Sequence, residues 1–177
     1  RNYLAPERDP GDQSTAAALS LLAEILGGGQ TSVLTQKLQF ETSTAVYSSA
    51  FYDGISLDDS SFGFVVVPAA DVTLQAAEDA LDQALAGFLE TGVDLAQLDR
   101  IKTQIAASEI YARDNVQGLA NSYGAALTSG LELADIHAWP AAVQAVRPED
   151  IMSAAKELLN EERSVTGWLM KPEEEAE

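Results

Sequence analysis

The sequence predicts an α+β fold, in which a largely antiparallel sheet carries helices packed on one face. Segments rich in β-branched and aromatic residues lie near both ends and in the first half of the chain, as expected for strands. Between them, apolar residues recur at spacings of three and four, which is typical of amphipathic helices. The resulting order is strand, helices, hairpin, helices, strand, without an internal repeat or a linker that would split the chain.

The first 39 residues predict a strand and two helices. Residues 1–6 alternate apolar positions and end at a proline, which indicates the end of a strand, and a charged turn follows over residues 7–11. Apolar residues spaced by three and four predict a helix over residues 12–26. Three consecutive glycines, Gly27, Gly28 and Gly29, end it, and a second short helix is expected over residues 32–39.

The next part predicts a β-hairpin. Residues 44–53 are rich in β-branched and aromatic side chains, and residues 61–68 form a second such run. The loop between them carries Gly54 and three aspartates. We therefore expect two antiparallel strands with a moderately long loop, the second of which ends at Pro68.

The rest of the chain is expected to be mostly helical. Apolar positions predict a helix over residues 71–90, and Asp94 with Gln97 resembles a capping box. That box opens a long helix reaching Tyr123, with a bend expected at Gly118 or Gly124.

The last fifty residues predict two shorter helices and a strand. Residues 133–146 form a helix interrupted by Pro140, and Pro148 suits the first position of a helix ending near residue 159. A closing strand is expected over residues 164–170.

Length and chain ends suggest one domain. The 177 residues suffice for a single α+β domain over residues 1–171, followed by an acidic tail over residues 172–177. The chain opens at Arg1 without a methionine, which indicates a fragment or a processed product.

Composition excludes several classes of function. Ten Lys and Arg against 28 Asp and Glu give a net charge of −18, which repels phosphate backbones and anionic lipids and argues against nucleic-acid or membrane partners. No apolar run is long enough to span a bilayer. With no cysteine and only His137, the chain lacks thiolate sites and any two-histidine metal site. It is therefore not expected to be a self-contained hydrolase.

Four candidate sites each have a simpler explanation. The three glycines before Thr31 and Ser32 could pass for a phosphate loop, but the P-loop lysine is missing and a helix precedes them. The aspartates of the hairpin loop lack EF-hand spacing and suit a solvated loop. Glu24 is expected to be partly exposed, and His137 to be a packing or interface residue. The residues alone identify no active site.

A series of short motifs runs in a fixed order along nearly the whole chain. They are Arg1-x-Tyr3-x-Ala5-Pro6, Ala18-Leu19-x-Leu21-Leu22-Ala23-Glu24-Ile25-Leu26-Gly27-Gly28-Gly29-x-Thr31-Ser32-x-Leu34, Ile110-Tyr111-Ala112-Arg113-Asp114, Tyr123-Gly124-x-Ala126-Leu127-x-x-Gly130-Leu131, Trp139-Pro140, Ala145-Val146-x-Pro148-Glu149-Asp150-Ile151 and Ser164-Val165-Thr166-Gly167-Trp168-Leu169. Together they resemble the C-terminal domain of bacterial pitrilysin/insulinase-type zinc metallopeptidases, the inverzincins.

The resemblance implies two similar α+β domains that face each other across a substrate chamber, of which only one is catalytic. The first domain of such enzymes carries an inverted H-x-x-E-H motif and a downstream glutamate, which hold zinc and activate water. This chain has no such motif, so it resembles the second, inert domain, with no catalytic residue and no metal ligand of its own. Zinc is then expected in the upstream domain of the parent chain. The first strand of the domain is also expected to be missing.

One feature of the family is altered here. Some members place an arginine and a tyrosine seven residues apart after the glycine turn, where they hold substrate or stabilise the transition state. The matching positions are Gln39 and Val46, and neither side chain can donate a charge-assisted hydrogen bond to an oxyanion. The pair would then come from a homologous partner subunit.

The resemblance therefore predicts a non-catalytic domain of a zinc endopeptidase, which walls a chamber for peptide substrates opposite the zinc domain. The residues expected nearest the chamber are Gly27, Gly28, Gly29, Thr31, Ser32, Gln39 and Val46. The alternative is a scaffold or assembly subunit whose parent has lost zinc and activity. A third possibility, an independent binding module, predicts a stable chain without a large exposed apolar face. A periplasmic location is expected, with the cytoplasm as the alternative.

Overall fold

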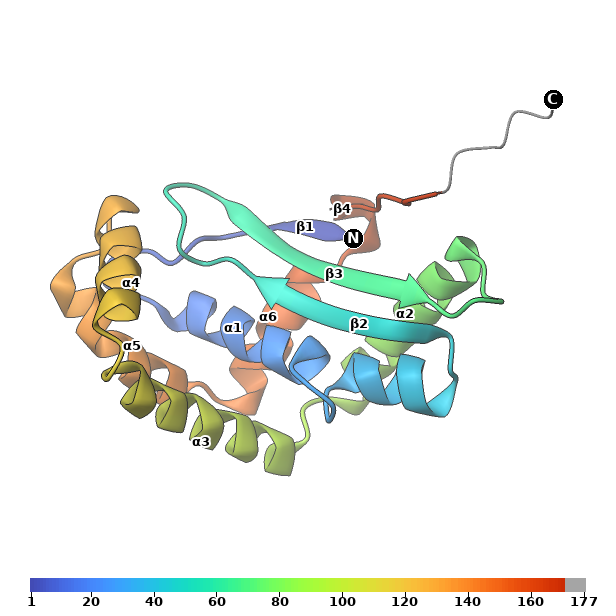
Figure 1. Ribbon diagram of the computed structural model, residues 1–177, viewed down its shortest axis with the longest axis horizontal. Helices are drawn as coiled ribbons and strands as arrows, with labels where there is room; N and C mark the ends of the chain where they lie inside the picture. The colour runs from blue at the N-terminus through green and yellow to red at the C-terminus, as the bar shows by residue number, and fades with distance from the viewer. Residues whose placement is uncertain (171–177) are drawn as a thin grey trace.

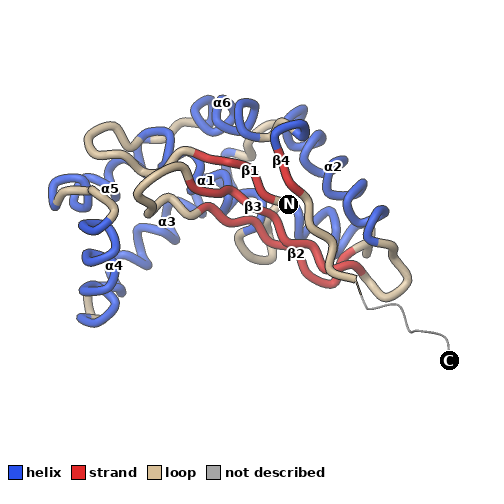
Figure 2. Tube along the Cα trace, turned by 90° about the horizontal axis from the view of Figure 1, so that it is seen from above, coloured by secondary structure: helices blue, strands red, loops and turns tan. Residues whose placement is uncertain are grey.

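A four-stranded antiparallel sheet forms one layer of the computed structural model, which describes residues 1–170. Its strands are β1 (Asn2–Ala5), β2 (Ala45–Tyr52), β3 (Ser60–Pro68) and β4 (Ser164–Val165), in the order β2-β3-β1-β4. The helices cover one face of this sheet (Figure 1, Figure 2), which confirms the predicted α+β class. The predicted acidic tail lies outside the described residues.

The predicted hairpin is confirmed as the longest strand pair. β2 runs antiparallel to β3, with Phe51 opposite Gly63 and Tyr47 opposite Val67. The register shifts between Ala45 and Tyr47, so that Val46 is an extra residue in β2. Such a bulge increases the local twist and changes the direction of the side chains that follow it.

The helix α1 (Ser14–Gly27) lies at the centre of the core, directly under β2 and β3 (Figure 1). Its buried residues occur on every side of the helix because α3, α5 and α6 cover the sides that the sheet leaves free. These residues are Ala16, Ala17, Ala18, Leu19, Leu21, Leu22, Ala23, Ile25 and Leu26.

Helix α2 (Leu74–Thr91) matches its predicted position. The Thr73 hydroxyl caps its first turn by accepting a hydrogen bond from the backbone N–H of Ala76 at 3.1 Å. Gly92, with a φ of 82°, ends it in the left-handed conformation that glycine tolerates best. The apolar face buries Leu81 and Phe88 against the core.

The long helix predicted from Asp94 to Tyr123 is wrong. The structure has two helices, α3 (Leu95–Ala112) and α4 (Val116–Thr128), and the break lies at residues 113–115 rather than at a glycine. The side chain of Asn115 accepts a hydrogen bond from the backbone N–H of Gly118 at 2.9 Å and so starts a new helix. Gly118 lies in the first turn of that helix and does not bend it.

The capping box predicted at the start of α3 is only half present. The Asp94 carboxylate accepts hydrogen bonds from the N–H groups of Ala96 and Gln97, at 2.8 and 3.4 Å. The Gln97 side chain does not return to Asp94. It donates instead to the carbonyls of Ile25 and Thr31, at 3.3 and 3.0 Å, and thereby ties α3 to the end of α1.

The end of the chain also departs from expectation. Helix α5 (Leu133–Ala145) continues through Pro140 rather than breaking there, and α6 (Pro148–Leu158) begins with its proline as predicted. A short turn of 3-10 helix, η2 (Glu161–Arg163), precedes β4. The predicted closing strand over residues 164–170 is too long, because only its first two residues pair with β1.

A buried arginine joins the loop after β1 to α5. The Arg8 guanidinium lies 4.1 Å from the centre of the Trp139 ring and is 7% exposed. It donates hydrogen bonds to the Gln13 side chain and, at 2.9 Å, to the carbonyl of Asp135. The Asp135 carboxylate accepts hydrogen bonds from two backbone N–H groups, those of Gly11 and Glu132, each at 2.8 Å. This network fixes the loop at residues 6–12 before α1 begins.

Candidate functional site

The glycine turn after α1 is shaped by its approach to β2. A Cβ atom at Gly27 would overlap the backbone of Ala50, so only glycine allows the end of α1 to lie against the strand. The backbone N–H of Gly28 donates to the carbonyl of Glu24 at 2.8 Å, and Gly29 has a φ of 76°. The glycines therefore end the helix and turn the chain sharply, as predicted from their position.

The turn ends at a fully buried serine. The Ser32 hydroxyl donates to the carbonyl of Gly29 at 2.8 Å and also lies 3.0 Å from the hydroxyl of Thr35. Thr31, next to it, is exposed, and its carbonyl is held by Gln97. Ser32 thus has a structural role, and Gly29 and Thr31 form the exposed surface of the turn.

The segment predicted as a short helix over residues 32–39 is helical, but its main part is a π-helix, η1 (Thr35–Glu41). The backbone N–H of Thr42 donates to the carbonyl of Lys37, five residues earlier, at 3.1 Å. Widened turns of this kind are rare and occur often at functional sites. Within the widened turn, the Gln39 amide donates to the Ser48 hydroxyl of β2 at 2.9 Å.

These contacts link four polar side chains across two elements. Ser32 contacts Thr35, Thr35 lies 3.4 Å from the Gln39 amide, and Gln39 reaches Ser48. Two of the predicted residues, Ser32 and Gln39, are therefore brought into one network. Thr35 and Ser48, which complete it, were missed because hydroxyl residues at these spacings carry no sequence signature.

Val46 stays outside this network. It is the extra residue of the β2 bulge, and its side chain is 63% exposed. Gln39 contacts Ser48, two residues further along the strand, and Ser48 is buried whereas Val46 is exposed. Tyr47, which follows the bulge, is 52% exposed and was not among the residues predicted for the site.

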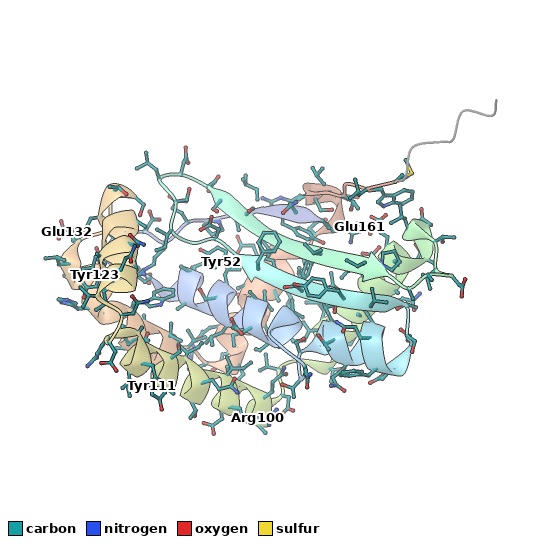
Figure 3. The ribbon with its side chains drawn as sticks, viewed as in Figure 1. Tyr52, Arg100, Tyr111, Tyr123, Glu132 and Glu161 are labelled. Carbon is teal, nitrogen blue, oxygen red and sulfur yellow. The ribbon has the colours of Figure 1, made fainter. Side chains whose placement is uncertain are left out.

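Beyond the bulge, the sheet presents a face that no helix within residues 1–170 covers (Figure 1, Figure 2). Its exposed apolar side chains alternate along the strands and form what we call the open face: Leu4, Tyr47, Phe51, Val65, Val67 and Val165. Tyr52 turns to the other side, where its hydroxyl donates to the carbonyl of Pro6 at 2.6 Å (Figure 3). Burial raises the pKa of the Tyr52 phenol, and nearby Glu7 and Asp53 raise it further.

The surface made by the glycine turn, η1 and β2 is almost uncharged. Between residues 27 and 52 the only charged residues are Lys37 and Glu41, which pair with each other at 2.7 Å. The rest of the chain carries the net charge of −18. This surface can therefore contact a polypeptide through shape, apolar side chains and neutral hydrogen bonds, and its one cation, Lys37, is already paired with Glu41.

Metal-binding groups do not gather in the part of the chain that the structure describes. Over residues 1–170, no group of three or more His, Asp or Glu side chains could hold a metal ion. His137 on α5 lies beside the ring of Tyr123 on α4, with ring centres 6.2 Å apart. None of the helices in the same residues combines the length and the apolar character needed to cross a membrane.

The sequence matches one protein family over residues 3–105, more than half of the chain, and that family is described as the Peptidase M16 inactive domain. The matched residues include the glycine turn, η1 and the hairpin. No curated protein matches the sequence.

Solved structures with the same fold are numerous, at low sequence identity. A protease from Helicobacter pylori superposes with a TM-score of 0.83 at 19% identity, over 92% of this chain and 38% of that one. The inactive peptidase domain of a proposed zinc protease from Bordetella parapertussis gives a TM-score of 0.78 at 16% identity, over 92% of this chain and 85% of that one. The periplasmic protease PqqL from Escherichia coli gives a TM-score of 0.62 at 19% identity, over 89% of this chain and 17% of that one. The chain thus spans well under half of the Helicobacter and Escherichia proteins.

Proposed function

The chain belongs to the peptidase M16 inactive-domain family, and on that premise we propose that it forms the non-catalytic wall of a peptide-degrading or processing chamber, opposite a zinc-bearing domain of its parent protein. The observation that carries the proposal is the family match, which covers the glycine turn, η1 and β2 in one block. Zinc and the groups that activate water would belong to the upstream domain, and the partners of this chain would be that domain and the peptide.

The surface around β2 supports a steric role. Gly29, Thr31 and Val46 are exposed, Gln39 is half-buried, and the exposed apolar side chains of the open face begin at Tyr47. A neutral, partly apolar surface tolerates many peptide sequences because it makes few specific polar contacts. The same exposed face argues against an independent binding module, for which no large exposed apolar face is expected.

Gln39 and Val46 suggest that the domain does not polarise the scissile carbonyl. A homologous subunit with an arginine/tyrosine pair would supply that function. The double variant Gln39→Arg/Val46→Tyr in the parent protein should raise kcat/KM for a quenched peptide in the absence of such a subunit. The matched control Gln104→Arg/Val116→Tyr adds the same groups at exposed positions of α3 and α4, and it should leave kcat/KM unchanged. Equal effects in both double variants would count against a chamber position for Gln39 and Val46.

The division between the domains is tested by comparing this chain with its parent. The isolated chain, incubated with zinc and a quenched peptide, should show no turnover. The parent should contain stoichiometric zinc and lose cleavage when a chelator is added. Zinc-dependent cleavage by the pure isolated chain would overturn the proposal.

A second candidate is a scaffold or assembly subunit whose parent has lost zinc and activity. Gln39 and Val46 favour this candidate, because these uncharged residues stand where the resemblance implies the arginine and tyrosine with which some related peptidases hold substrate. A parent without zinc and without cleavage, even after the partner subunit is added, would establish the scaffold.

We further propose that the parent acts in the periplasm, by analogy with the periplasmic protease from Escherichia coli that shares the fold. Cell fractionation with an antibody against this domain tests the location, and recovery in the cytoplasmic fraction alone would refute it.

A further inference from the structure

A groove of about 880 Å³ lies beside the carboxyl end of β1. Strand β4 pairs with Asn2 and Tyr3 only, so the following part of β1 has β3 on one side and this groove on the other. Helix α6 lies next to β1 on that side (Figure 2), and its last turn forms one wall. The loop at residues 6–12 forms the other wall. The groove therefore lies at the edge of the sheet opposite to β2, away from the glycine turn and η1.

The floor of the groove is apolar. Ala16 and Leu19 of α1 and Leu158 of α6 are buried there, and Ala154 is half-buried beside them. The packing of α1 against α6 holds this floor in place. It can accept the methylene groups of a long side chain, because the contact removes the apolar surface of both from water.

The rim of the groove carries four carboxylates, which come from the loop and from α6: Glu7, Asp9, Asp12 and Glu157. Within residues 1–170, none of them forms a salt bridge. Arg8, which lies among them in sequence, is directed instead to the Trp139 ring and the carbonyl of Asp135. In the described part of the chain, Arg163 is the one cation among the lining residues. A further cation in the groove would relieve the mutual repulsion of the carboxylates.

The backbone of β1 adds a hydrogen-bond acceptor on the same side. Arg1 exchanges backbone hydrogen bonds with Phe64 of β3, at 2.8 and 2.9 Å, so the odd-numbered residues of β1 face β3 and Leu4 faces the groove. If β4 continued the ladder, the N–H of Arg163 would bond the Leu4 carbonyl. It donates instead to the carbonyl of Asn160 at 2.9 Å, at the start of η2. The Leu4 carbonyl can therefore accept a hydrogen bond from an occupant of the groove.

We infer that this groove binds a short, extended, cationic peptide. The aliphatic stems of its Lys or Arg side chains lie on the apolar floor, their charged groups lie between the carboxylates of the two walls, and a backbone N–H donates to the Leu4 carbonyl. Charge complementarity specifies the occupant, because the rim and the backbone both offer acceptors and negative charge. Thirteen residues line the groove, about half the number that each side of a stable protein–protein interface contributes, so a short peptide fits it better than a folded partner.

This inference goes beyond the proposed function. The groove lies at the other edge of the sheet from Gln39 and Val46, and it would hold cationic peptides at the parent protein whether or not they are cleaved there. Its test measures binding to this chain without any cleavage. A failure of that test leaves the chamber wall untouched, and a parent without activity leaves the groove untouched.

The test is an NMR titration of the isotopically labelled chain with the peptide acetyl-Gly-Arg-Thr-Lys-Gly-amide, whose two cations project on one side when it is extended. Amide signals of residues 4–16 and 154–163 should shift, and those of η1 and β2 should stay unchanged. The matched peptide carries citrulline and norleucine in place of Arg and Lys, so it keeps both stems and lacks both charges. It should bind roughly tenfold more weakly, the effect of two exposed ion pairs.

Two double variants of equal charge separate the groove from the overall negative field of the chain. Asp9→Asn/Glu157→Gln removes one carboxylate from each wall and should raise the Kd of the cationic peptide roughly tenfold. The control Glu90→Gln/Asp99→Asn removes two carboxylates from α2 and α3 and should leave the Kd nearly unchanged. All four side chains are exposed, so both variants should keep the fold, which circular dichroism checks.

The variant Arg163→Gln should have the opposite effect. It removes the cation that competes with the peptide, and it should lower the Kd roughly threefold. Weaker binding to Arg163→Gln would overturn the proposal, as would equal binding of the two peptides or equal losses in the two double variants. Signals that shift only outside the groove would also overturn it, because the peptide would then bind elsewhere on the acidic surface.

Discussion

The central helix of the helical layer and the helices at one end of it are built in opposite ways. Helix α1 is buried along nearly its whole length, whereas α4 buries only Ala126 and lies at one end of the molecule (Figure 1). The second half of α3 and α4, which we call the arm (residues 106–128), exposes Ile110, Tyr111 and Val116. Figure 3 labels Tyr111 on this arm. Both regions are apolar in sequence, so apolar content alone does not tell core from surface. The difference predicts that α1 determines the stability of the fold and the arm contributes little.

The largest effect is expected from removing core volume in α1. Leu22 is fully buried, and Leu22→Ala should lower the free energy of unfolding by about 3 kcal/mol, through lost burial and the cavity that remains. The matched change in the arm, Leu127→Ala at a side chain that is 47% exposed, should cost less than about 1 kcal/mol. Urea denaturation followed by circular dichroism measures both. Similar losses in the two variants would contradict the proposed contrast.

Two glycines give a sharper form of the same contrast. Gly27→Ala should destabilise the fold by about 2 kcal/mol, because the added methyl group overlaps the backbone of Ala50 and separates α1 from β2. Gly124 in α4 has open space where a Cβ would lie. Gly124→Ala should therefore be neutral or stabilise by up to about 1 kcal/mol, since alanine is the better helix former. Denaturation midpoints decide the sign, and destabilisation by both would show that the arm is packed more tightly than its exposure indicates.

A pH titration tests how the core is connected to α5. Hydrogen bonds from the backbone N–H groups of Gly11 and Glu132 lower the pKa of the Asp135 carboxyl below its usual 3.8, and the nearby Arg8 adds to this. A lowered pKa in the folded state stabilises the protein above the usual value, and that stability is lost as the pH falls through the folded-state pKa. Stability should therefore decline below about pH 4 in part because of Asp135.

The variant Asp135→Asn should flatten this acid dependence. The control Asp114→Asn removes an exposed carboxylate within the arm and should leave the acid dependence as it is. Denaturation midpoints between pH 7 and pH 3 report both. An acid dependence unchanged in Asp135→Asn would assign the loss of stability to other carboxylates.

The same contrast explains what could be predicted from the sequence. Periodic apolar positions and the three glycines located α1 and its end because burial imposes both signals. The break between α3 and α4 was missed because its cause is one side-chain cap at Asn115, in a region where no burial constrains the pattern. The inward role of Gln97 was also missed, since its position suited a cap.

The candidate site was located from motifs rather than from chemistry. The glycine turn and Gln39 lie next to β2. The π-helix and its hydrogen bond to Ser48 depend on how η1 packs against β2, and no local pattern specifies that contact. The position of all seven residues at a chamber stays a prediction.

The smallest global effect is expected from uncapping the arm. Asn115→Ala removes the hydrogen bond to the N–H of Gly118 and should weaken α4 by about 1 kcal/mol. Because α4 shares little buried surface with the core, this loss should speed amide exchange within α4 about fivefold and leave the exchange of α1 amides unchanged. The corresponding variant of α2, Thr73→Ala, removes a similar cap from a helix that buries Leu81 and Phe88. There the same loss should appear in global unfolding, because α2 cannot open without exposing the core. If Asn115→Ala also accelerated exchange in α1, the arm and the core would unfold as one unit, and the contrast in burial would not be a contrast in stability.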